Sequence, residues 1–228
     1  MTKFDHPILA HLAAVQAERE RRAKSPQLMA GVQAIKVYQH HRFADTYRDL
    51  LRTDRYEPAV RFFLDELYGP GDFSERDAQF ARVIPALVRI FPADIVQTVE
   101  ALTSLHALSE TLDSQMGAQI DVRDRSASDY ARAWQRTGRA DHRERQIALM
   151  LSVGAALDAL TRKPMLRTSL LLMRTPARVA GLAELQQLLE RGLETFRSMG
   201  GAQEFLELIG QRERAVCTQL FSGVALYP

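Results

Sequence analysis

Apolar residues recur along most of this chain with the spacing of an α-helix. The clearest case lies between residues 75 and 91, where one face carries Phe80, Val83, Ile84, Leu87 and Phe91. The last four lie three, four, seven and eleven residues after the first, which places all five on one side of a helix. No stretch alternates with a period of two between turn signals, so no β-sheet is expected.

The same period predicts helices along the rest of the chain. They are expected over residues 28–52, 57–68, 75–91, 93–116, 128–138, 147–163, 175–196 and 205–220. Ser128 is expected to cap the helix that stops at Gly138. Thr175 with Pro176 indicates a helix start, because a hydroxyl can cap the first turn and proline fits into it. We therefore predict an all-α, multi-helix bundle of about eight to ten helices, in a single helical domain over residues 1–228 with a possible boundary near 117–127.

Composition narrows the class of protein. The chain has 228 residues and a net charge of only +2, so no strong positive field is expected. Its single cysteine, Cys217, excludes an intrachain disulfide and a cysteine-based zinc cluster. No apolar run approaches the length of a membrane span, and the N-terminus lacks the pattern of a secretion signal. We expect a cytoplasmic protein without membrane contact.

The stretch FFLDELYGPGDFSERDAQ, residues 62–79, concentrates carboxylates around a glycine-proline break. One interpretation is a metal or acid–base site made by Asp65, Glu66, Asp72, Glu75 and Asp77. The spacing matches neither a calcium loop nor the Glu-x-x-His pairs of di-iron bundles. The favoured interpretation is a structural joint in which helix closure, turn and helix capping involve Gly69, Pro70, Asp72, Ser74 and Asp77.

Three blocks of the chain resemble a family of uncharacterised bacterial proteins. They are YQHHRFADTYRDLLRTDRYEPAVRFFLDELYGPGDFSERDAQFARVIPALVRIFP, LHALSETLD and AGLAELQQLLERGLETFRSMGGAQEFLELIGQRE. The characteristic segment is Phe-Phe-Leu-acidic-acidic-Leu-Tyr-Gly, followed by Arg-Asp after the turn. The resemblance covers most of the chain and implies an α-helical domain of unknown function. It implies no catalytic residues.

His106 is the first candidate for chemistry. Thr103, His106, Glu110 and Asp113 fall on one stripe of their helix, so Glu110 could orient the imidazole from one turn away. A metal or haem ligand and a carboxylate-oriented general base are the functional alternatives. A boundary histidine satisfied by its own helix is favoured, because no second ligand follows at helical spacing.

The segment YQHHRFADTYRDL, residues 38–50, is the second candidate. His41 and Asp45 lie four residues apart, as do Tyr38 and Arg42. A polar site in this segment could face His106 across a cavity, with His41 as the donor. A solvated helix with intrahelical ion pairs is the favoured interpretation, since such pairs are common and weak.

Nucleic-acid binding is not expected. Residues 121–145 hold seven arginines and the only tryptophan, but five acidic residues reduce the net charge of that stretch to +2. A solvated helical surface is the favoured interpretation. Cys217 is expected to be a small buried hydrophobe.

These patterns favour a non-enzymatic helical binding or regulatory module that contacts a protein or a small apolar ligand. They identify no catalytic residue and imply no metal. Self-association as a homodimer is expected, through the leucine stripe of LAELQQLLERGLETF at 182–196. The alternative is an enzyme or sensor with an inter-helix pocket around His106, with haem as one option for its ligand.

Overall fold

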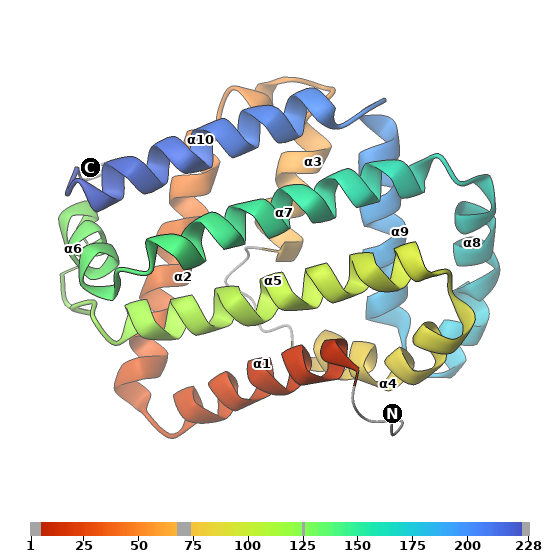
Figure 1. Ribbon diagram of the computed structural model, residues 1–228, viewed down its shortest axis with the longest axis horizontal. Coiled ribbons are helices and arrows are strands. Elements are labelled where there is room, and N and C mark those ends of the chain that lie inside the picture. The colour runs from red at the N-terminus through yellow and green to blue at the C-terminus, as the bar shows by residue number, and fades with distance from the viewer. Residues whose placement is uncertain (1–5, 68–73, 125, 225–228) are drawn as a thin grey trace.

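A computed structural model describes residues 6–67, 74–124 and 126–224. Within these ranges the chain forms helices and no strand (Figure 1), so the predicted all-α bundle is confirmed. The α-helices are α1 Pro7–Ala23, α2 Pro26–Thr46, α3 Glu57–Phe62, α4 Ser74–Ile90, α5 Ala93–Gly117, α6 Ala127–Thr137, α7 Ala140–Thr161, α8 Pro164–Val179, α9 Ala183–Ser198 and α10 Gln203–Phe221. A 3₁₀ turn spans Leu50–Arg52, and a π-helical segment, Phe63–Leu67, continues α3.

The longest of these helices, α5, lies at the centre of the molecule. Figure 1 shows α1, α5, α7 and α10 running side by side, while α2 and α9 cross behind them in this view. α5 packs against α1, α2 and α7, and α7 packs in turn against α10. α6 and α8 lie at opposite ends of the molecule. No helix in the described ranges is both long and apolar enough to cross a membrane.

Two apolar clusters occupy the interior of the part of the chain that the structure describes. The larger one joins α2, α3, α7, α9 and α10 through Phe43, Tyr47, Val60, Phe63, Ile147, Met150, Phe196, Phe205 and Ile209. The second lies near α6 and contains Ile35, Met116, Tyr130, Trp134, Val216 and Leu220. Inward-facing residues on these helices recur every three or four positions. The apolar faces predicted from the sequence therefore contain many of these core residues.

Several predicted boundaries are wrong in ways that local hydrogen bonds explain. α6 is capped by Ser126, whose hydroxyl accepts from the Asp129 amide at 3.1 Å, and not by Ser128. The predicted helix over 28–52 ends at Thr46, and the 3₁₀ turn follows. The helix over residues 7–23 was not predicted, because only Ile8 and Val15 among its apolar residues are fully buried.

The predicted helix start at Thr175–Pro176 is also wrong. Both residues lie inside α8, which ends at Val179. The break is Gly181, which adopts a left-handed φ of 68°. The Leu182 amide donates to the Ala177 carbonyl at 2.8 Å and the Gly181 amide to the Arg178 carbonyl at 3.1 Å. This is the Schellman pattern of helix closure, and a second helix, α9, begins after it.

Gly31 and Gly117 let α2 and α5 approach until their backbones touch. A Cβ added to Gly31 would lie 2.1 Å from the Gly117 carbonyl oxygen. A Cβ added to Gly117 would lie 2.8 Å from the backbone nitrogen of Val32. Since backbone atoms cannot swing aside, only glycine fits at either position.

We expect Gly117→Ala to lower the free energy of unfolding by about 1–3 kcal/mol, the usual cost of overpacking. The matched control is Gly154→Ala in α7, where the added Cβ would meet the flexible end of Leu206. Urea unfolding of both variants measures the difference. Equal losses of stability would show that α2 and α5 can move apart to accommodate the added methyl group.

Candidate functional site

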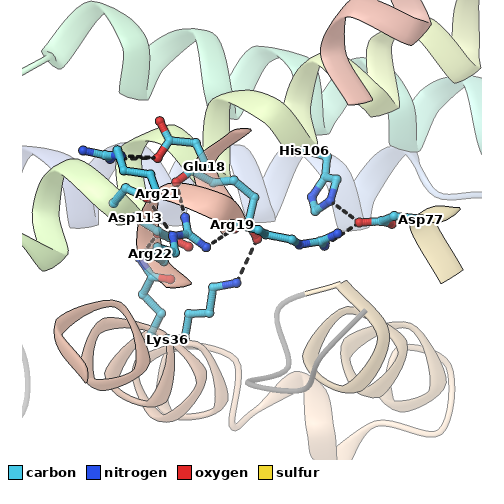
Figure 2. A network of polar contacts seen from close by, with 11 residues as sticks. Glu18, Arg19, Arg21, Arg22, Lys36, Asp77, His106 and Asp113 are labelled. Atoms are coloured by element: carbon cyan, nitrogen blue, oxygen red, sulfur yellow. Dashed lines mark hydrogen bonds and ion pairs between the residues drawn. The ribbon is translucent and has the colours of Figure 1, made fainter. Parts of the chain in front are cut away.

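His106 projects from α5 toward the first turn of α4. Its Nε2 lies 2.9 Å from Oδ2 of Asp77, and the guanidinium of Arg19 in α1 donates to the same oxygen at 2.5 Å. Figure 2 shows this chain of three side chains from three helices. Burial opposes ionisation of Asp77, but the hydrogen bond and charge of His106, with the charge of Arg19, outweigh it and lower the pKa of the carboxyl. Asp77 therefore joins helices, a role that its interpretation as a capping residue did not include.

Glu110 belongs to a separate buried ion cluster. Its carboxylate pairs with Arg22 of α1 and with Lys36 of α2, whose Nζ lies 2.8 Å from Oε1. The buried Arg22 also donates through Nε to the Ser114 hydroxyl at 2.7 Å. Burial raises the pKa of Glu110, but the charges of Lys36 and Arg22 overcome this and lower it to about 2. Glu110 is thus committed to two cations and does not orient His106.

Asp113, one turn further along α5, has a different environment. It is buried, and it accepts a hydrogen bond from Gln39 of α2 at 3.1 Å. Burial raises the pKa of its carboxyl, and the neighbouring charge of Glu110 adds to the rise. Opposite shifts in two neighbouring carboxylates can indicate a catalytic site when they line a cleft. Here they lie between packed helices. Two grooves of the described surface lie elsewhere, one between α7 and α10 (530 Å³) and one between α5 and α7 (270 Å³).

The structure does not bring the second candidate segment to His106. The Tyr38 ring stacks on Tyr130 of α6 with centroids 3.9 Å apart. His41 is exposed on α2 with its ring 6.0 Å from that of His40. Asp45 forms an ion pair with Arg48. Arg42 reaches across to Glu213 of α10 at 2.6 Å, so this helix is tied to the core more firmly than a solvated helix would be.

The Arg-rich stretch is not the solvated helical surface that was predicted, because Tyr130 and Trp134 of α6 belong to the second apolar cluster. Arg143 is buried, and its guanidinium lies 3.9 Å from the ring centroid of Trp134. Arg132 is exposed and pairs with the partly exposed Asp124 and the buried Asp129. Cys217 is half-buried between both apolar clusters, and burial raises its pKa to about 11. It therefore remains a thiol at neutral pH.

The acidic joint is only partly described. Gly69, Pro70 and Asp72 lie outside the described residues, and Ser74 begins α4. Glu66 pairs with Arg191 of α9 at 2.8 Å. In the described part of the chain, no three His, Cys, Asp or Glu side chains are grouped so as to hold a metal ion.

The main feature that sequence reasoning missed is an apolar surface at the α8 end of the molecule. Eight of the eleven large apolar side chains that are exposed in the described chain lie on α8, α9 and the end of α4. They are Ile90, Phe91, Met165, Leu171, Leu172, Met173, Val179 and Leu189. The other three, Met29, Val37 and Val224, lie on α2 and near the end of α10.

The most exposed of these side chains form one stripe. Met165, Leu172 and Val179 are 81%, 73% and 82% exposed and follow one another at intervals of seven residues, so they lie on the same side of α8. We call these three residues, with Ile90 and Phe91, the α8 face. Lys163, just before α8, forms an ion pair with Asp94 at the start of α5. Gly181, just after α8, accepts a hydrogen bond at its carbonyl from Arg82 of α4. These bonds hold the two ends of α8 against the helices that flank Ile90 and Phe91.

Comparison with known proteins adds a family but no activity. Residues 18–226 match the model of a family described as Domain of unknown function (DUF8198). Neither a curated protein nor a solved structure matches the chain.

Removing the Glu110 carboxylate tests the buried ion cluster. We expect Glu110→Ala to lower the free energy of unfolding by about 3–5 kcal/mol, because Arg22 then remains buried without its counter-charge. The control is Glu144→Ala, which breaks an exposed pair with Arg214 and should cost less than about 1 kcal/mol. Similar losses for the two variants in urea unfolding would contradict this ranking.

The same cluster predicts a pH dependence. Glu110 has a folded-state pKa of about 2 against an ordinary value of 4.5, so its contribution is complete above pH 4.5 and is lost as the pH falls toward 2. The stability difference between the wild type and Glu110→Gln should therefore shrink over that window. Urea unfolding at pH 7, 4 and 3 measures it, and a difference independent of pH would rule out an ionised Glu110 as the cause.

Proposed function

The chain belongs to the DUF8198 family, and we propose that it is a non-enzymatic binding module that docks on a partner through the α8 face. The observation that carries the proposal is the stripe of Met165, Leu172 and Val179, which an otherwise well-covered helical protein leaves in water. Singly exposed apolar side chains are normal on protein surfaces, but several on one side of a single helix favour an interaction site.

The polar candidates support a structural role instead. His106, Glu110 and Asp113 each bond to a side chain of another helix, and these bonds join α1, α2 and α4 to α5. Groups bound in this way are held in place by packing and are not presented to a substrate. These polar side chains are therefore better explained as contacts that hold the helices together than as a site for a substrate.

The leucine stripe of α9 offers less surface than the α8 face. Leu185 and Phe196 are buried, and Gly192 lies against the ring of Phe62. Leu189 is exposed, and its helix packs against α8. A partner that covers α8 can therefore include α9 at its edge, with α8 as the main contact.

A pocket at His106 remains the second candidate, on one observation. The Asp77–His106 pair has the form of a carboxylate-oriented imidazole, and the His106 side chain is 26% exposed. The same hydrogen bond engages Nε2, one of the two imidazole nitrogens through which histidine binds a metal. The pair is thus better suited to joining α4 and α5 than to binding a metal centre.

Site-specific photo-crosslinking tests the α8 face. A photoreactive amino acid placed at Leu172 should give one discrete adduct in cells that make the protein, since a partner would lie against it. The same amino acid at Met29, which is exposed on α2, is the matched control and should give none. Equal, diffuse labelling from both positions would mean that the α8 face is an ordinary surface.

His106→Ala separates the two candidates. We expect a loss of about 1–3 kcal/mol in the free energy of unfolding, because a hydrogen bond to the ionised Asp77 disappears. Native mass spectrometry of wild type and variant should show the same ligand content. A bound mass that is present in the wild type and lost from a folded His106→Ala protein would favour the pocket.

A further inference from the structure

We infer that the α8 face is covered by the same face of a second copy of the chain, in an antiparallel pairing whose two-fold axis passes beside Leu172. The inference rests on the proposed function, because it names the partner of that surface. It is carried by the symmetry of the stripe, the position of the charges and the size of the surface.

The stripe is self-complementary. Leu172 lies seven residues from Met165 and seven from Val179, so both neighbours are about 10 Å from it along the helix axis. A two-fold axis at Leu172 places each Leu172 against its copy and each Met165 against the partner's Val179. A closed symmetric dimer requires this kind of self-matching surface, since the same patch must serve on both sides.

The surface around the stripe permits close approach. Thr168, Ser169 and Thr175 flank it and are all exposed, small and uncharged. Two helices pack with axes about 8–10 Å apart when the side chains at the contact allow it. Antiparallel pairing also sets the two helix dipoles in opposite directions, which avoids repulsion between like ends.

The charges favour a second copy over an anionic lipid surface. Between Asp158 and Glu184 the chain carries five basic residues and no acidic one, as a lipid-binding helix would. However, Arg162 pairs with Asp158, Lys163 with Asp94, and Arg174 with Glu190 at 2.6 Å. The arginines of α8 itself, Arg167, Arg174 and Arg178, also lie about 140° around the helix from the stripe, by the geometry of 3.6 residues per turn. They therefore point away from a layer pressed against the stripe.

The size of the surface indicates a dimer of moderate affinity. α8 has 16 residues and is about 24 Å long, whereas a standard interface buries about 800 Å² on each partner. A helix of this length and about 10–12 Å wide presents less than that area, so the inferred contact also includes Ile90 and Phe91. We therefore expect dissociation in the micromolar range, below the affinity of larger obligate dimers.

Sedimentation velocity of the full-length protein tests the pairing. Wild type at tens of micromolar should sediment as a dimer, while Leu172→Glu should weaken association at least about 100-fold, because two carboxylates would meet at the axis. Met29→Glu, on α2, should leave the dimer intact. Far-UV circular dichroism confirms that each variant is folded.

A charge-swap experiment tests the position of the axis. Leu172→Glu and Leu172→Arg should each be monomeric alone and should form a heterodimer when mixed, since residue 172 of one copy faces residue 172 of the other. A dimer that survives either single substitution, or a mixture that stays monomeric while the wild type dimerises, would place the axis elsewhere and overturn the pairing.

The crosslink at Leu172 separates this inference from the proposed function. An adduct of twice the chain mass of 25.8 kDa supports the second copy. An adduct of another mass overturns the second copy and keeps the docking surface. A monomeric wild type that sediments with phosphatidylserine vesicles, but not after Leu172→Glu, identifies a lipid surface instead. A monomeric wild type without adduct or vesicle binding overturns both ideas.

Discussion

The ionised Glu110 inside the bundle is the constraint on which the arrangement of the helices depends. It sits on the central helix, α5, and its two oxygens bind cations from α1 and α2. A carboxylate in an apolar interior is stable only if its partners arrive with it. α1 and α2 must therefore dock on α5 in one register, and the Gly31–Gly117 contact sets how closely α2 can do so. The register of these three helices follows from one charge and one pair of glycines.

The docking of α1 on α5 also explains the hydrogen bond of His106. With α1 in place, Arg19 lies one turn before Arg22 and reaches the carboxylate of Asp77 on α4. That carboxylate then lies at hydrogen-bond distance from the imidazole. The polar residues that resemble a catalytic site in the sequence thus form two sets of ion pairs and hydrogen bonds between helices. We call these sets clamps, one centred on Glu110 and one on Asp77. Both clamps join the N-terminal helices to the centre of the fold.

The sequence predicted most helices because their inward faces repeat every three to four residues, as in α4 and α5. It did not predict α8, whose apolar residues lie on two sides. Leu166 and Leu170 turn inward while Met165 and Leu172 turn outward, so no single stripe appears. It also missed the clamps. Arg22 and Glu110 are 88 residues apart, and a single sequence carries no sign that two distant charges are paired. His106 was singled out on the correct helix but with the wrong partner, because Asp77 comes from another element.

α8 is also the helix with the fewest buried side chains in the described chain. Among its residues with a described side chain, Ala177 alone is fully buried. Segments with little buried surface open to solvent at a small free-energy cost, while central helices such as α5 open only when the whole domain unfolds. The amides of α8 should thus exchange with solvent long before those of α5. A partner bound to this helix would slow that exchange. Binding and the local stability of this 16-residue helix are therefore coupled.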